Sequence, residues 1–526
     1  MRNWTALAVA TLALAAPAQA KWHKAESPHF IVYADDSEQD IRKFAEILER
    51  FHSAMRLLTG GDDVIPSPSN RLVIFAVGSG GKVAHLAGDK SGTVAGFYRP
   101  GAGSSRAFVP NIQLTSGEND FSLTVLLHEY AHHFLISADR FAMPRWVDEG
   151  AAEFFASAKF ARDGSVGIGR PAHHRAGELA YADDVKVEEL LDRALYEKNR
   201  GKRYDAFYGR AWGLYHYLVM DQVQKGPRKG QLSAYTRAIM AGKPEREAAT
   251  SAFGDLKQLE KDLDAYLKRG RMMSFQFTQQ QIPSAGVQVA ALSAGEAEVI
   301  PLRIRSQRGV NREQALELLP RVRAVAAKYP QDPAVLAALA EAEHDAGNDA
   351  AAIAAADKAI ALDPGQTNAY VQKGYALFRL ASDAEPGKKA AALREAMKPF
   401  GALNKLENDH PLPLIYLYRT FAEQGREPSE LARHALERAS QLAPFDRALT
   451  FEVALMQARE GKIALASSTL QAVANNPHGG AMAETARKLT DEIGKIAEGT
   501  PWRGSPPVGL ARIDAEGEAP GDGNSR

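Results

Sequence analysis

Leu126 to Leu135 read Leu-Leu-His-Glu-Tyr-Ala-His-His-Phe-Leu, a segment that contains the pattern His-Glu-x-x-His. Apolar residues recur in and around it at helical spacing, which predicts a helix. His128 and His132 then lie one turn apart, about 6 Å along the axis, and two ring nitrogens on one face can hold a zinc ion. Glu129 lies beside that position, where its carboxylate can take a proton from a water molecule.

A second segment supplies a third candidate ligand. Residues 144–155 read Pro-Arg-Trp-Val-Asp-Glu-Gly-Ala-Ala-Glu-Phe-Phe. Pro144 suits a helix start, so we expect a second helix from about Arg145 to Phe155 that packs back on the first. A catalytic zinc takes three protein ligands and keeps one position for water, and Glu149 is placed to be the third ligand. Glu153, one turn further on, would accept the free ring N–H of a ligand histidine.

Each pattern also has a simpler interpretation. Two histidines at i and i+4 often form only one face of a helix, and Glu149 and Glu153 could lie on a solvated helix face. The two segments together nevertheless contain every donor that a catalytic zinc site needs. The sequence therefore favours a metal site.

These residues resemble the gluzincin metallopeptidases, specifically their peptidase MA-like branch. In the matching segments, sixteen residues separate His132 from Glu149, which lies in Trp-Val-Asp-Glu-Gly-Ala-Ala-Glu-Phe. The resemblance implies that His128, His132 and Glu149 bind Zn²⁺ and that Glu129 is the general base. It covers roughly residues 26–218. The Gly-x-Met-Glu-Asn motif of the gluzincin aminopeptidases is not found in this chain, which argues against exopeptidase activity.

Other polar side chains near these segments are weaker candidates for a catalytic or metal-binding role. A zinc peptidase needs a donor for the oxyanion, and Tyr208, or with less support Tyr215 or His216, could supply it, although core packing is the commoner role for each. His173 and His174 follow in a polar loop, where a solvated pair is commoner than a pair of metal ligands.

Composition limits the function classes. The 526 residues carry 64 Lys plus Arg against 64 Asp plus Glu, so no basic excess points to nucleic acid or anionic lipid. Residues 1–20 combine Arg2, an apolar run and Ala18-Gln19-Ala20, which predicts a Sec-type signal peptide cleaved after Ala20; a membrane anchor is the alternative. No later segment predicts a membrane span, and no cysteine occurs. We expect a periplasmic or secreted protein.

The region that precedes the motif predicts alternating strands and helices. Short β-rich runs occupy residues 29–33 and 71–77, and Ser37 can cap a helix whose apolar stripe begins at Ile41. Glycines at 78, 80 and 81 predict a flexible turn, because the lysine and hydroxyl of a phosphate-binding loop do not follow them. Residues 93–98 and 106–109 suit a hairpin. Together with this pattern, the resemblance to the gluzincins implies an α+β, zincin-like catalytic domain over residues 21–275.

A polar stretch over residues 276–310 predicts a linker, and residues 311–498 predict helical repeats. Pro330 lies 34 residues before Pro364, and Pro477 lies 33 residues after Pro444, close to the period of tetratricopeptide repeats. Small residues recur within this frame, and residues 382–411 interrupt it with an insertion. The segment resembles tetratricopeptide-repeat modules, which implies a concave face that binds a protein partner; a generic helical bundle is the alternative. Residues 499–526 predict a disordered tail.

These expectations combine into an exported zinc peptidase that acts on a peptide or protein substrate through a metal-activated water. The alternative is a non-catalytic envelope scaffold in which the repeats bind partner proteins.

Overall fold

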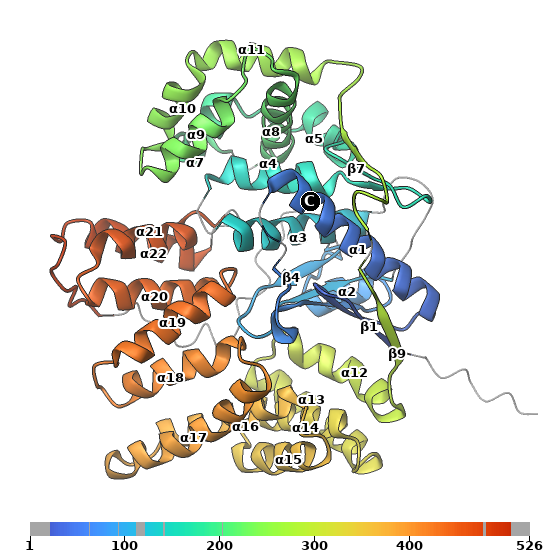
Figure 1. Cartoon of the computed structure of the whole chain (residues 1–526), viewed down its shortest axis with the longest axis vertical. Helices are drawn as coiled ribbons and strands as arrows, with labels where there is room; N and C mark the ends of the chain where they lie inside the picture. Colours follow the sequence, from blue (N-terminus) through green and yellow to red (C-terminus); the bar gives the residue numbers. More distant parts are fainter. Residues whose placement is uncertain are drawn as a thin grey trace, which may run out of the picture.

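The computed structural model describes residues 22–505, except residues 61, 63, 93, 112–120, 140–142, 202, 284 and 477–479. The predicted signal peptide, Pro477 and residues 506–526 of the predicted tail lie outside the described residues. The described chain forms an N-terminal α+β part and a C-terminal array of paired helices that follows an arc around it (Figure 1). Among the described helices, none combines the length and the apolar character needed to cross a bilayer.

A six-stranded mixed sheet forms the centre of the N-terminal part. Its strands follow the order β4-β5-β3-β2-β1-β9, in which β2, β3 and β5 are parallel and the other pairs are antiparallel. The strands are β1 (His23–Glu26), β2 (Phe30–Ala34), β3 (Leu72–Ala76), β4 (Phe97–Arg99), β5 (Arg106–Val109) and β9 (Gln288–Ala291). The two predicted strands and the predicted hairpin, which is β4 with β5, are therefore present.

Helices α1 (Glu38–Thr59) and α3 (Phe121–Asp139) cover one face of this sheet. The Oγ of Ser37 accepts a hydrogen bond from the backbone N–H of Asp40 at 3.2 Å, which is the predicted cap of α1. Alternate residues of the strands, such as Phe30 and Ile74, form a buried core with these helices. The large apolar content of α3 follows from its position between the sheet and the helices beyond it.

Residues 78–81 differ from the prediction of a flexible turn. Helix α2 (Gly80–Ala87) begins there, with the Oγ of Ser79 accepting from the backbone N–H of Lys82. Gly78 precedes the cap at a φ of 113°, Gly80 and Gly81 occupy only the first turn of the helix, and Val83 and Leu86 on its apolar side are buried. The serine cap and these two residues outweigh the low helix propensity of glycine.

Helix α4 (Arg145–Ala156) follows α3, as predicted, and leads into a helical layer beyond the main sheet. This layer includes a small antiparallel sheet of β6 (Lys159–Phe160), β7 (Val166–Ile168) and β8 (Phe275–Phe277). Its helices are η2 (His173–Arg175), α5 (Ala176–Tyr181), α6 (Val187–Leu190), α7 (Arg193–Asn199), α8 (Phe207–Gln224), α9 (Gln231–Met240), α10 (Glu245–Phe253) and α11 (Leu256–Leu267). A short turn of helix, η1 (Pro68–Asn70), precedes β3.

The predicted linker over residues 276–310 is wrong in structural terms, because most of it is built into the fold. Strand β9 pairs with β1, and helix α12 (Ala294–Gln307) covers the second face of the main sheet. Ile300 and Ile304 pack on that face, whereas Val299 and Leu302 pack on the next helices of the array. Since α12 is apolar on two sides, it has no single stripe for a periodicity argument to detect.

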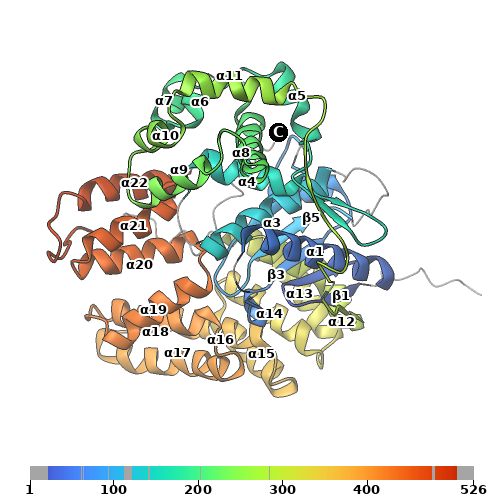
Figure 2. The ribbon, with the colours of Figure 1, turned by 45° about the horizontal axis from the view of Figure 1, so that its top comes forward.

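The remaining helices form antiparallel pairs stacked side by side, as Figure 2 also shows. They are α13 (Arg312–Lys328), α14 (Pro333–Asp345), α15 (Asp349–Leu362), α16 (Thr367–Ser382), α17 (Pro386–Leu406), α18 (Pro411–Glu423), α19 (Glu430–Leu442), α20 (Arg447–Arg459), α21 (Ile463–Ala474) and α22 (Ala481–Ile493). Pro330, Pro364 and Pro444 follow the second helices of three pairs. The predicted insertion lengthens α17 to 21 residues.

The start of the predicted tail is also corrected. The backbone N–H of Trp502 donates to the carbonyl oxygen of Ala458 at 2.9 Å, and its indole donates to Glu492 at 2.8 Å. Its ring is buried against α20 and α22. The array therefore remains packed through Trp502, three residues beyond the predicted boundary at 499.

Candidate metal centre

The candidate site lies between α3 and α4, and the packing of α4 on α8 helps to position it. Gly150 lies at the closest approach of α4 and α8, where an added Cβ would be 2.6 Å from the carbonyl oxygen of Ala211. Trp146 and Phe154 anchor α4 on either side, and both are fully buried. A glycine directly after Glu149 thus lets α4 pack tightly on α8 and face α3 with its carboxylates.

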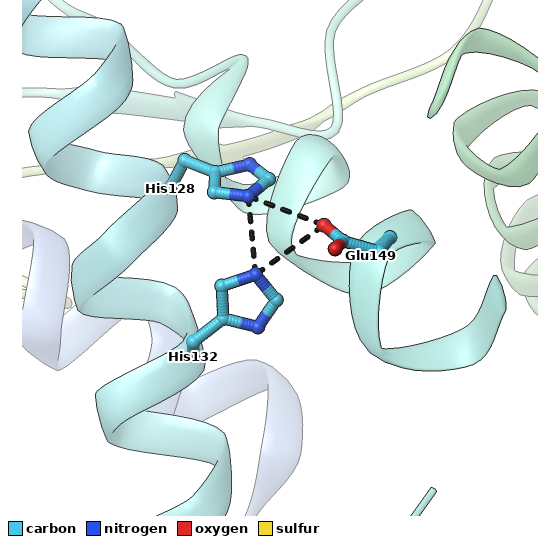
Figure 3. A group of neighbouring side chains, drawn as sticks. All are labelled: His128, His132 and Glu149. Atoms are coloured by element: carbon cyan, nitrogen blue, oxygen red, sulfur yellow. Dashed lines mark hydrogen bonds and ion pairs between the residues drawn. The ribbon is translucent and has the colours of Figure 1, made fainter. Parts of the chain in front are cut away.

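Three predicted ligands meet at one point, as Figure 3 shows. The Nε2 atoms of His128 and His132 are 3.1 Å apart. The Oε2 atom of Glu149 lies 3.3 Å from Nε2 of His128 and 3.4 Å from Nε2 of His132. All three side chains are buried, Glu149 completely.

This donor set fits a zinc ion. Bonds of about 2.0–2.1 Å in a tetrahedral arrangement put neighbouring donor atoms about 3.3–3.4 Å apart. The three observed separations, from 3.1 to 3.4 Å, agree with that value. Two imidazoles and one carboxylate are also a donor set of catalytic zinc sites, which keep a fourth position for water.

Two further carboxylates fix the orientation of the histidine rings. The Nδ1 of His128 lies 3.1 Å from Oε1 of Glu153, and the Nδ1 of His132 lies 3.0 Å from Oδ1 of Asp148. Each Nδ1–H therefore donates to a carboxylate, which leaves each Nε2 directed at the shared point. Glu153 occupies the predicted position; Asp148 was not predicted, although its place directly before Glu149 is a usable signal.

Glu153 is itself held by two residues from η2. The Nε2 of His174 lies 2.5 Å from Oε2 of Glu153, and a guanidinium N–H of Arg175 donates to Oε1 at 2.6 Å. The expectation that His174 is a solvated loop residue is therefore wrong, because its ring points inward. Sequence reasoning considered His174 only as a possible metal ligand and missed Arg175, since both residues join the site only through the path of the chain between α4 and α5.

The carboxylates favour positive charge at this point. Burial alone lowers the pKa of His128, but hydrogen bonds to Glu149 and Glu153 outweigh it and raise the pKa to about 9. The pKa of His132 is likewise well above its ordinary value, because Asp148 and Glu149 outweigh burial. Burial raises the pKa of Glu153, but Arg175 and His128 more than reverse this and hold the pKa well below the ordinary value. A bound cation would replace the imidazole protons.

The predicted base and the first candidate oxyanion donor also lie at the site. Glu129 and Tyr208 line the same cavity as His128 and His132. The ring centre of Tyr208 is 6.5 Å from that of His128, and burial, followed by the charge of Glu149, raises the pKa of Tyr208 so that its hydroxyl keeps its proton.

The other two candidate donors belong to the core. His216 is fully buried and forms hydrogen bonds with the Tyr266 hydroxyl and the carbonyl oxygen of Gly169. Tyr215 packs beside Gly150 and Phe154.

One family model matches residues 122–228, and its description is "Protein of unknown function (DUF1570)". The matched segment begins in α3 and ends just after α8, so it contains all three candidate ligands, Glu129 and Tyr208. No curated protein matches the chain.

Two solved structures are similar to parts of the chain. One is a thermophilic tetratricopeptide-repeat protein of Thermus thermophilus, TTC0263, with 16% identity and a TM-score of 0.32, covering 38% of this chain and 100% of its own. The other is the double mutant MamA RS-1 ArsTM, with 16% identity and a TM-score of 0.27, covering 38% of this chain and 99% of its own. Neither TM-score is high enough to carry an argument. The repeat architecture rests on the helix pairs described above.

Proposed function

We propose that this chain is a zinc-dependent peptidase of the gluzincin type, with a zincin-like catalytic part at residues 21–275. The observation that carries the proposal is the meeting of His128, His132 and Glu149 at tetrahedral donor separations, with Glu129 on the adjoining cavity wall. On the basis of residues 1–20, we also propose that the reaction takes place in the periplasm or outside the cell.

Zinc bound to these three residues would supply a Lewis acid that polarises the substrate carbonyl and lowers the pKa of a water molecule. Glu129 takes the proton of that water as it attacks the carbonyl carbon, and then gives the proton to the leaving amine. Tyr208, which stays protonated, donates a hydrogen bond to the developing oxyanion. Glu153 and Asp148 keep the two imidazoles in the tautomer with free Nε2 atoms.

The test begins with metal content. We expect about one zinc per chain in the purified protein, and a marked loss in His128→Ala and Glu149→Ala. Glu129→Gln should keep its zinc and lose hydrolysis of an unfolded protein such as casein. Glu188→Gln, which changes an exposed carboxylate on α6 that does not line the cavity, is the matched control and should keep both. Unchanged hydrolysis by Glu129→Gln would refute the proposed mechanism.

A second candidate is a scaffold whose repeats bind a protein partner and whose metal-binding part does not catalyse. The size of the ordered helix array, which extends from α12 to α22, favours it. The two candidates differ in their response to a chelator. A peptidase loses its activity when zinc is removed, whereas a scaffold shows no hydrolysis at any zinc concentration and keeps its partner.

A further inference from the structure

A single cavity joins the candidate metal centre to the helical array. Its volume is about 2590 Å³, and it is lined on one side by His128, Glu129 and His132. The opposite wall is formed by the array. The metal centre therefore opens into a space that the repeats border on the other side.

The lining of the far wall follows the architecture of the array. It comes chiefly from the first helix of each pair, namely α12, α14, α16, α18, α20 and α22, with α13 adding residues at its two ends. No residue within α15, α17, α19 or α21, as far as the structure describes them, lines the cavity. These helices therefore form the side of the stack that faces the N-terminal part, which is its concave side because the array follows an arc around that part (Figure 1). The concave face of the array is thus the second wall of the cavity.

Direct contacts fix this wall against the N-terminal part. At the start of the array, Ile300 and Ile304 pack on the main sheet. In the middle, the backbone N–H of Ser69 donates to Glu407 at 2.9 Å. Further along, the backbone N–H of Ala102 donates to Asp446 at 2.8 Å.

Two more contacts lie closer to the metal centre and to the end of the array. The ring of Phe445 stacks on His133, the residue after the candidate ligand His132, at 4.3 Å between ring centres. A guanidinium N–H of Arg193 donates to the carbonyl oxygen of Ala474 at 3.2 Å. Because contacts are made at its beginning, middle and end, the array holds a set distance from the metal centre.

The size of the cavity indicates a polymer. Sites for small molecules measure about 300–1,000 Å³, well below the 2590 Å³ found here. A folded domain of about 100 residues, with a radius of gyration of about 13 Å, occupies roughly 20,000 Å³ and cannot enter. An extended polypeptide fits, since it advances about 3.3–3.6 Å per residue and is one chain thick.

The chemistry of the far wall indicates a polypeptide and not a nucleic acid. Arg379, Arg419 and Arg447 contribute guanidinium groups from successive first helices, and such groups donate to carbonyl and carboxylate oxygens. Glu341 and Glu452 lie among them, and Glu452 pairs with Arg419, so the wall carries both charges and lacks the excess of positive charge that a phosphate backbone requires. The mixture of donors and acceptors suits peptide groups, which carry both.

We propose that the metal centre and the concave face of the repeats form one substrate channel, in which an extended, unfolded polypeptide lies across both. This inference rests on the proposed function for the identity of its substrate. Its consequence is selection by conformation and length: the repeats hold the chain on one side while a bond is presented to the metal centre on the other. Folded proteins, and peptides too short to reach the repeats, are poor ligands.

Binding can be measured without catalysis. The full chain carrying Glu129→Gln, loaded with zinc, is titrated against fluorescein-labelled casein, an unfolded polypeptide, and anisotropy gives Kd. Arg419→Ala with Arg447→Ala is then added in the same background. We expect Kd for casein to rise about tenfold or more, because two charged donors are lost. Arg394→Ala, an exposed arginine on α17 that does not line the cavity, is the matched control and should leave Kd unchanged.

Arg419 also pairs with Glu452 at 2.8 Å, so circular dichroism and zinc content must first match those of the parent protein. A second measurement does not depend on that variant: casein carrying a benzophenone group should crosslink to α16, α18 and α20 in the Glu129→Gln protein. Crosslinks confined to other surfaces, an unchanged Kd in the folded double variant, or equal binding of folded lysozyme would each overturn the channel.

The two proposals fail differently. Casein that binds through Arg419 and Arg447 but is never cleaved by the zinc-loaded wild type would refute the peptidase and keep the channel. Casein that is cleaved at the same rate by the double variant and by the wild type would refute the channel and keep the peptidase. Peptides of about six residues, which extend to at most about 22 Å, serve as short ligands and should bind weakly to every variant.

Discussion

Replacing Gly150 by alanine tests whether the close approach of α4 to α8 sets the position of Glu149. An added Cβ lies 2.6 Å from the carbonyl oxygen of Ala211 and 2.9 Å from the Cβ of Tyr215. Ordinary contacts begin at 3.4 Å, so the backbones must separate by about 3.4 − 2.6 = 0.8 Å. Zinc sites keep their ligand distances within about 0.2 Å. The neighbouring carboxylate would thus leave its position by several times the tolerated shift.

We expect Gly150→Ala to lose about 1–3 kcal/mol of stability through overpacking. Zinc affinity should fall about tenfold or more, because the ligand set no longer closes on one point. Thermal unfolding followed by circular dichroism measures the first effect, and competition with a zinc-binding dye measures the second.

Gly401→Ala is the matched control. Gly401 lies inside α17, where an added Cβ meets no atom within 4 Å. The substitution should gain up to about 1 kcal/mol from the better helix propensity of alanine and leave zinc binding unchanged. If Gly150→Ala melted and bound zinc like the wild type, the packing of α4 on α8 would not determine the site, and the reasoning would be refuted.

Three further outcomes follow from the contacts described. Glu153→Gln should weaken zinc binding about 10- to 100-fold in dye competition while the fold is kept, because His128 loses the carboxylate that orients its ring. Tyr208→Phe should lower kcat of casein hydrolysis by about 10²-fold with little change in KM, and an equal loss in a binding assay would contradict its role as an oxyanion donor. Burial lowers the pKa of His410 to about 4, against the opposing charge of Glu407, whereas the unfolded chain titrates near 6.5. Between these values the unfolded state binds the extra proton, so stability should fall as the pH drops from about 6.5 to about 4, by roughly 3 kcal/mol in all. Thermal melts across this range should show a flatter profile for His410→Asn, while His434→Asn, at an exposed position, should keep the wild-type profile.

Local sequence signals account for the elements with one buried face. Helix α1 was predictable because Ser37 caps it and its apolar residues recur every three to four positions. Helix α12 was not, since it packs on the sheet with Ile300 and on the array with Leu302. The same contrast explains why β9, with a single pairing partner far away in sequence, was taken for part of a linker.

The residues of the candidate site fall into the same two groups, those that a local sequence pattern predicts and those that it does not. His128, His132 and Glu149 could be predicted because two contiguous segments contain them, and helix geometry fixes which side chains share a face. His174 and Arg175 could not, because no local spacing relates η2 to α4. Their contacts with Glu153 depend on the three-dimensional path of the chain between these elements.

The pairing of β9 with β1 determines when the main sheet can finish folding during synthesis of the chain. Strand β1 is among the first described residues of the chain, yet its outer edge has no partner until residues 288–291 have been synthesised. An uncovered strand edge is a template for pairing with other chains. Biosynthesis must therefore keep the nascent N-terminal part from aggregating until more than half of the chain exists. A shortened chain that ends before β9 is expected to be insoluble, whatever the state of its metal centre.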